Sequence, residues 1–426
     1  MNAASNDIAP AAIKSRRIFY LIFATATLLV LGLIYAWSIF ASPIGKTYPH
    51  YGPLLPQVFQ VSMFAFCVSA LFGAQIIKRA SARLAIIIAA ALLGIGFVLT
   101  AFASGLGAWA LFLFYGVFAA SGCGIAYNAI ISLVNPWFPD KIGFCSGVQM
   151  MGFGVSSLVF GSIANAMFGV MDWSLVFVII AVVGVAVMVL LAFVVQPAPA
   201  NLAATLGLKG AVSAAKLSPT KAQGILSTRV FWVYSLWATA VIACGLTVIG
   251  TAKQGAEAMG LDPGLGALLV GLISTMNGLS RIINGVIFDR FGLAPVMTLS
   301  AVLAIVTMVG LAFSFISATA AFVYIAAAIL VAMPYGSVPV MASAYARQRY
   351  NAADFAKNLG IANCNIATAA IVNIVIVSLF GSPVGENAPV VYGILAALSV
   401  VSLAATFVFR KIYAADLAQI AEEVGS

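Results

Sequence analysis

The chain has 426 residues, of which 63% are hydrophobic and only 7% are charged. A water-soluble domain of this size does not need so many apolar residues to fill its core, so the composition indicates a protein that resides in the bilayer. The net charge of +9 does not indicate nucleic-acid binding, because the cations are spread between apolar segments instead of forming one basic face.

Apolar runs long enough to cross about 30 Å of hydrocarbon as a helix recur along the whole chain. They predict an all-α membrane protein with twelve transmembrane helices. The predicted helices cover residues 18–42, 54–77, 84–103, 107–133, 142–166, 174–195, 230–252, 264–288, 294–314, 320–343, 356–380 and 389–410.

The longest gap between these helices, residues 196–229, is rich in Pro, Ala, Gly, Ser and Lys, as linkers are. We therefore predict an N-terminal six-helix half over 1–195, a cytoplasmic linker over 196–229 and a C-terminal six-helix half over 230–426. Such a duplicated architecture places a substrate site between the halves, near the bilayer midplane.

The basic residues predict the orientation of the chain. All but three of the 20 Lys and Arg residues fall on one side of the predicted helices; Lys46 and Lys253 fall on the other side, and Arg281 lies within a helix. The positive-inside rule then places both termini and the linker in the cytoplasm. We expect a multi-pass protein of the cell membrane, the inner membrane of a bacterium.

The acidic residues and cysteines argue against an enzyme. All eleven Asp and Glu residues fall in predicted loops, termini or helix ends, and the five cysteines have no metal-ligand spacing to His50, the only histidine. The sequence contains no nucleophile, base and orienting group in a recognisable set. It predicts no enzymatic activity, no metal and no cofactor.

Arg281 is the candidate substrate-binding residue. An arginine at the centre of a membrane helix costs about 2.5 to 3.5 kcal/mol on insertion scales, and a guanidinium offers paired donors that match both oxygens of a carboxylate. Ser274, Asn277, Arg281 and Asn284 are three or four residues apart and share one helix face. The alternative is that Arg281 pairs with helix-end carbonyls or a distant acid and only holds the halves together.

Other polar and small residues within the predicted helices have a structural and a functional interpretation. Tyr35, Tyr127 and Tyr335 each need a hydrogen-bond partner in an apolar run, which a ligand or ordinary packing can supply. Asn363 is a candidate ligand contact in a helix whose polar residues interhelical hydrogen bonds would also explain. Gly271, Gly278 and Gly285 recur every seven residues, which predicts a close helix contact.

Three sequence segments resemble a known family. They are Tyr35-Ala-Trp-Ser-Ile-Phe-Ala-Ser-Pro43, Asn135-Pro-Trp-Phe-Pro-Asp-Lys-Ile-Gly-Phe-Cys-Ser-Gly147 and Gly285-Val-Ile-Phe-Asp-Arg-Phe-Gly292. The chain resembles the oxalate/formate antiporter family of the major facilitator superfamily, close to the monocarboxylate transporters. The resemblance covers essentially the whole chain. It implies the major facilitator fold and the exchange or cotransport of small carboxylates.

The resemblance also implies site residues. Arg281 matches the substrate-binding arginine of helix 8, Tyr35, Gln60, Tyr127 and Tyr335 match polar and aromatic cavity positions, and Phe153 replaces a cavity tyrosine. Two positions depart from the relatives: Ile366 stands where the oxalate carrier has a lysine, and Asn277 stands where monocarboxylate transporters often have an aspartate. A site with one cation suits a monoanion better than a dianion.

The sequence therefore predicts a secondary active transporter of a small organic monocarboxylate of the lactate, pyruvate or formate class. It leaves open whether a proton or a counter-anion is coupled to transport. The alternatives are an oxalate/formate-type anion exchanger and an anion sensor that does not transport. The predicted partners are the carboxylate and the lipid bilayer, without nucleic acid, and the predicted oligomeric state is a monomer.

Overall fold

The protein is described by a computed structural model, which describes residues 10–139, 142–199, 202–206, 224–317, 321–349 and 355–425. Twelve helices in these residues are long and apolar enough to cross a membrane, from Ile13–Thr47 to Ala388–Asp416. The prediction of an all-α protein with twelve transmembrane helices is confirmed. The predicted linker lies largely outside the described residues, and its boundaries stay a prediction.

Six spans form the first half, and several of them are built from more than one helical segment. The elements are α1 (Pro10–Leu31), η1 (Gly32–Ala36) and α2 (Trp37–Thr47); α3 (Leu55–Arg79); α4 (Ala82–Ala103); α5 (Ala108–Ala110), η4 (Leu111–Ala119) and α6 (Ala120–Val134); α7 (Ile142–Ser156), η6 (Ser157–Gly161) and α8 (Ser162–Met167); and α9 (Trp173–Val194). A short helix, α10 (Leu202–Thr205), follows them.

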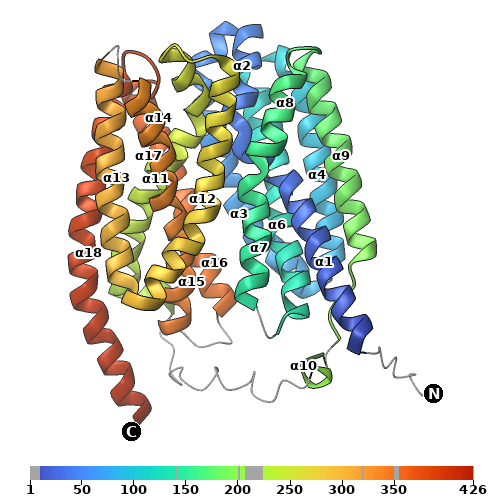
Figure 1. Ribbon diagram of the computed structural model, residues 1–426, viewed down its shortest axis with the longest axis vertical. Helices are drawn as coiled ribbons and strands as arrows, with labels where there is room; N and C mark the ends of the chain where they lie inside the picture. Colours follow the sequence, from blue (N-terminus) through green and yellow to red (C-terminus); the bar gives the residue numbers. More distant parts are fainter. Residues whose placement is uncertain are drawn as a thin grey trace.

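Six more spans form the second half. The elements are α11 (Arg229–Ala258); α12 (Pro263–Phe291); α13 (Leu293–Ile316); α14 (Ala321–Leu330) and α15 (Ala332–Arg349); α16 (Phe355–Asn363) and α17 (Asn365–Phe380); and α18 (Ala388–Gly425). Figure 1 shows the first six spans on the right and the last six on the left, with both termini at the lower end. We call that lower end the near end and the opposite end the far end.

Local sequence signals set several helix boundaries. The carboxylate of Asp172 accepts a hydrogen bond from the Ser174 amide at 2.8 Å and caps α9, and Asp262 caps α12 in the same way through Gly264 at 2.7 Å. Bonds from the side chain and backbone of Ser174 lower the pKa of the Asp172 carboxyl. Gly292, with φ of 82°, ends α12 in a left-handed conformation that a side chain would strain.

The two halves pack chiefly through α3 against α17, α12 against α7 and η6, and α11 against α2. The α7–α12 contact depends on glycine, because a Cβ at Gly154 would lie 3.1 Å from the Gly278 Cα, and one at Gly271 would lie 2.6 Å from the Leu158 Cα. The predicted close contact at Gly271 and Gly278 is therefore confirmed. A Cβ at Gly285 would meet nothing within 4 Å, so the contact does not continue to that glycine.

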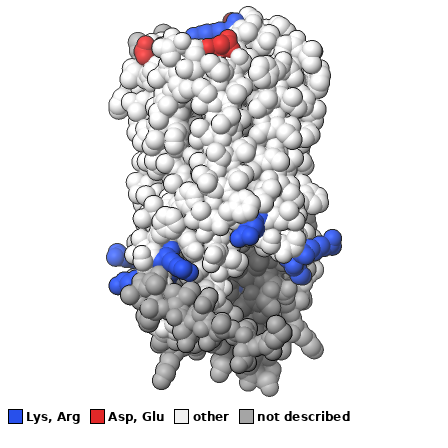
Figure 2. All heavy atoms as spheres, turned by 90° about the vertical axis from the view of Figure 1, so that its right-hand side faces the viewer, with Lys and Arg blue, Asp and Glu red and all other residues white. Residues whose placement is uncertain are grey.

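The surface has charged residues at its ends and an apolar band between them, as expected for a protein that spans a membrane. Figure 2 shows charged side chains at the two ends of one face and a broad uncharged band between them. On α9, Val182, Leu190 and Phe193 are 63%, 56% and 60% exposed. Large apolar side chains this exposed would be unfavourable in water, and they fit a surface in contact with lipid.

Candidate substrate-binding site

The first span is irregular where it reaches the centre of the molecule. The 3-10 segment η1 separates α1 from α2, and Tyr35 lies in it, buried. A Cβ on Gly32 would lie only 2.1 Å from the carbonyl oxygen of Phe153, so this close approach of η1 to α7 requires glycine. The tighter 3-10 turn changes the direction of the side chains that follow, and Tyr35 lies against Phe153.

Four predicted site residues come together in one aromatic cluster at mid-depth. The Tyr35 and Tyr127 rings each meet the Phe153 ring edge to face, with centroids 5.4 and 5.0 Å apart, a favoured aromatic geometry. The hydroxyl oxygens of Tyr35 and Tyr335 are hydrogen-bonded at 3.1 Å. Because Tyr35 belongs to the first half and Tyr335 to the second, this cluster joins the two halves at the centre.

Arg281 on α12 faces this cluster. Its guanidinium interacts electrostatically with the hydroxyl groups of Tyr127, Tyr35 and Tyr335. The Nε and Nη1 atoms are buried without a hydrogen-bond partner, while the residue as a whole keeps partial exposure. Among the described residues, Arg281 has no ion pair with a carboxylate. A buried cation with two free donors favours an anionic ligand at this position.

Asn277 lies one turn before Arg281 and is buried against α15. A Cβ on Gly336 would lie 2.9 Å from the Asn277 Oδ1, so only a glycine lets the two helices approach here. This Oδ1 has no hydrogen-bond donor in the described residues. Asn277 therefore packs against Gly336 of α15, and its place in the substrate site stays a prediction.

Gln60 and Asn363 have other surroundings. The Gln60 Oε1 accepts a hydrogen bond from the Asn373 Nδ2 at 3.2 Å, and that Nδ2 also donates to the Ala243 carbonyl oxygen at 3.0 Å. These bonds tie α3, α17 and α11 together, which supports the structural interpretation for Asn373. Phe66, whose ring lies 5.7 Å from that of Tyr127 and 6.0 Å from that of Phe153, follows Gln60 on α3 by six residues, about 9 Å of helical rise. Asn363 is partly buried at the break between α16 and α17.

Lys253 is another buried cation within a span, and its burial was not predicted. The apolar run predicts that this helix ends at residue 252, but α11 continues to Ala258 and leaves Lys253 only 3% exposed. Its ammonium donates to the Asn165 Oδ1 at 2.5 Å and lies 3.9 Å from a Glu257 oxygen. Lys253 and Glu257 are four residues apart, a spacing at which opposite charges pair on a helix. This spacing was the sequence signal that α11 continues past residue 252.

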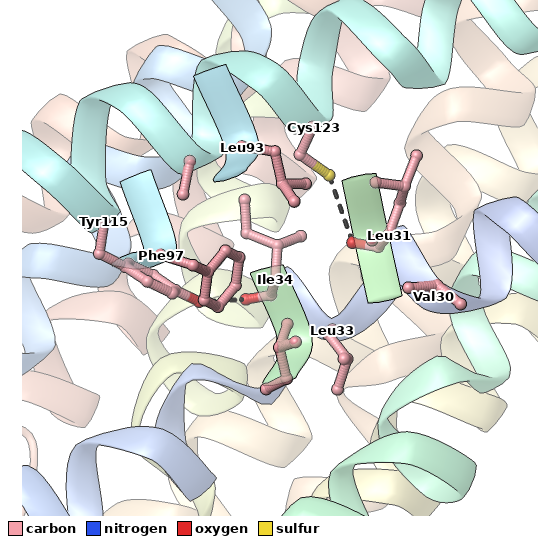
Figure 3. Close-up of a pocket in the computed structure, with 11 residues that line it drawn as sticks. Val30, Leu31, Leu33, Ile34, Leu93, Phe97, Tyr115 and Cys123 are labelled. Atoms are coloured by element: carbon pink, nitrogen blue, oxygen red, sulfur yellow. Dashed lines mark hydrogen bonds between the residues drawn. The ribbon is translucent and has the colours of Figure 1, made fainter. Parts of the chain in front are cut away.

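An apolar cavity lies inside the first half, away from Arg281. Figure 3 shows Phe97 and Ile34 among its lining residues, with hydrogen bonds from Cys123 to the Leu31 carbonyl oxygen at 3.3 Å and from Tyr115 to the Ile34 carbonyl oxygen at 3.4 Å. Its volume of about 10 Å³ holds roughly one water molecule. A carboxylate does not fit there, so this cavity is not the substrate site.

Sequence comparison gives one family. The chain matches the Major Facilitator Superfamily over residues 18–372. It is 25% identical over 355 residues to an uncharacterized MFS-type transporter, YhjX, of Escherichia coli (strain K12), covering 83% of this chain and 85% of that protein. It is 24% identical over 360 residues to the oxalate:formate antiporter of Oxalobacter formigenes, covering 83% and 82% of the two chains.

Solved structures of transporters share the fold. The xylose transporter XylE from E. coli, in a partially occluded inward-open conformation, gives a TM-score of 0.71 at 14% identity and covers 91% of this chain and 96% of its own. The nucleoside transporter NupG gives 0.68 at 13% identity, with 93% and 99% covered. At such identities the likeness shows the fold alone, and it confirms the predicted arrangement of two six-helix halves.

Proposed function

Because this chain belongs to the major facilitator superfamily of membrane transporters, we propose that it carries a small organic monocarboxylate, of the lactate, pyruvate or formate class, by alternating access. The observation that carries the proposal is Arg281, whose Nε and Nη1 are buried without a hydrogen-bond partner in the described residues. A carboxylate would take both donors and neutralise the charge. The relative named as an oxalate:formate antiporter supports a carboxylate substrate.

The surroundings of Arg281 favour a monoanion. Tyr35, Tyr127 and Tyr335 place neutral hydroxyl groups beside the guanidinium, and these can donate to a carboxylate without adding charge. Ile366 contributes no charge on α17. A second carboxylate on the substrate would be desolvated without a cation to balance it, which is unfavourable in a site of low dielectric constant.

Phe153 and Phe66 provide the apolar side of the site. Phe153 is 1% exposed and its ring lies 6.0 Å from that of Phe66. A short alkyl or methyl group of the substrate would pack on these rings while the carboxylate faces Arg281. We further propose that the near end, with its excess of Lys and Arg, faces the cytoplasm of a bacterial cell.

Transport by the purified protein in liposomes tests the proposal. Labelled lactate, formate and oxalate are offered with and without internal anion and with and without a pH gradient, which separates exchange from proton-coupled uptake. We expect uptake of a monocarboxylate and loss of at least tenfold in rate for Arg281→Ala. The matched control is Arg290→Ala, because Arg290 is exposed at the near end of the same helix and should keep normal rates.

Three outcomes would contradict the proposal. Full transport by Arg281→Ala would remove Arg281 from the site, and preferred uptake of oxalate would assign the chain to dicarboxylate exchange. Saturable binding of the anion without any flux would identify a sensor instead of a carrier.

A further inference from the structure

A polar network at the far end joins the two halves through Lys253. Its ammonium on α11 donates to the Asn165 Oδ1 on α8 at 2.5 Å, and Glu257, one turn later, accepts a hydrogen bond from the Ser42 hydroxyl on α2 at 3.2 Å. Gln254 on the same helix donates to the Ser38 carbonyl oxygen at 3.0 Å. The last turns of α11 are thus bonded to two spans of the first half.

This network is too far from Arg281 to contact the same substrate ion. A Cβ on Gly266 would lie 3.3 Å from the Lys253 Cγ, so Lys253 stands beside Gly266 of α12. Arg281 is fifteen residues further along that helix, about 22 Å by helical rise. Lys253 therefore serves a different step of the transport cycle from ligand binding at the central site.

We propose that Lys253 and Asn165 form the gate that closes the far end of the carrier. This proposal rests on the proposed carrier function, from which it takes one assumption: the two halves rock against each other. When the far end opens, α8 and α11 separate, and the bond between Asn165 and Lys253 breaks. Glu257 stays with Lys253 because both belong to α11.

A lysine suits a gate that must both close and reopen. A charged hydrogen bond is about twice as strong as a neutral one, so it holds the closed state. Lys253 is only 3% exposed, so its ammonium carries a desolvation penalty in the closed state. Opening admits water to the ammonium and removes this penalty. These two terms oppose each other, which keeps the open and closed states close in free energy. An apolar contact of the same size has no such compensation.

Two substitutions of Asn165 test the proposal, one that strengthens its bond to Lys253 and one that removes it. Asn165→Asp converts the bond into an ion pair and should lower the population open at the far end about tenfold. Asn165→Leu leaves the ammonium without its acceptor in the closed state and should raise that population about tenfold. In a Lys253→Met background, the Asp variant should no longer favour the closed state, because its carboxylate has no cation to pair with.

Spin-label distances across the far end measure these populations in the protein without substrate. Labels at Val170→Cys and Glu386→Cys report on the two halves, since Val170 is 81% exposed and Glu386 is exposed. Cys364, the half-buried native cysteine, is replaced by Ala. His50→Gln is the control, because His50 is an exposed polar residue at the same end and should leave the distances unchanged.

The proposal is overturned if neither Asn165 variant changes the distances, if both shift them in the same way, or if the shifts persist in the Lys253→Met background. If Asn165→Leu does not fold, the proposal is decided by comparing the distances in Asn165→Asp with those in the Asn165→Asp, Lys253→Met double variant. Since no substrate is used, these results stand apart from the transport assay, and either proposal can fail without the other.

Discussion

Lys253 and Arg281, two cations within the spans, differ in how far the chain satisfies them. Lys253 at the far end has an amide acceptor at 2.5 Å and a carboxylate oxygen at 3.9 Å. Arg281 at the centre has tyrosine hydroxyls beside it, and its Nε and Nη1 lack acceptors in the described residues. A cation that the protein itself satisfies serves structure and gating, whereas one with free donors is available to a ligand.

The largest effect is expected from giving Arg281 a partner of its own. Asn277→Asp places a carboxylate one helical turn from the guanidinium, where opposite charges pair. This internal anion would compete with the substrate, and we expect the KM for a monocarboxylate to rise at least tenfold. Concentration-dependent uptake in liposomes measures it. Asn277→Ser, which adds no charge, is the control, and an unchanged KM in the Asp variant would show that position 277 does not reach Arg281.

A smaller effect is expected from removing one hydroxyl of the bonded pair Tyr35 and Tyr335. Tyr35→Phe or Tyr335→Phe removes one oxygen of the 3.1 Å bond between the halves, and such a bond contributes about 1 kcal/mol. Each single variant should lower the uptake rate by roughly fivefold, the factor that this energy corresponds to. The double variant should lose little more than either single variant, because both remove the same bond. Strictly multiplicative losses would show that the two hydroxyls act separately.

The smallest effect is expected from removing the charge of Glu257. Glu257→Gln keeps an acceptor for Ser42 but leaves the Lys253 ammonium without its carboxylate. The side chain of Glu257 is 27% exposed, so solvent weakens the pair, and we expect a loss of only about 1 kcal/mol of stability. A melting temperature a few degrees lower, with an unchanged KM, is the expected result. A large increase in KM would instead place Glu257 in the substrate path.

The sequence was sufficient to predict the membrane helices and the residues of the central aromatic cluster. Length and apolar composition alone define the twelve spans, because hydrocarbon thickness fixes how many residues a helix needs. Arg281, Tyr35, Tyr127, Tyr335 and Phe153 were predicted as site residues, and the structure brings them together. That convergence depended on the family resemblance, since the residues come from five different spans.

Other features could not be predicted because they depend on tertiary contacts. The predicted end of the seventh span at residue 252 was wrong, since a charged residue stops an apolar run even when a neighbouring helix supplies its partner, as Asn165 does for Lys253. The bond from Asn373 to the Oε1 of Gln60 joins two helices that are far apart in the sequence, and the place of Gln60 in the cavity stays a prediction. At η1, which interrupts the first span, the Tyr115 hydroxyl donates a hydrogen bond to the carbonyl oxygen of Ile34. The local sequence does not predict this bond, because the two residues are far apart in the chain.

In a carrier whose two halves rotate against each other, the glycine contact between α7 and α12 would lie at the pivot. From Gly154, which touches Gly278, to Ile142 at the start of α7 the lever arm is twelve residues, about 18 Å by helical rise. A rotation of about 10° around this contact moves the near end of the helix by about 3 Å, within the range of hinge motions in proteins. A side chain at either glycine would shift the pivot away from the central site and change how far each end opens for the same rotation.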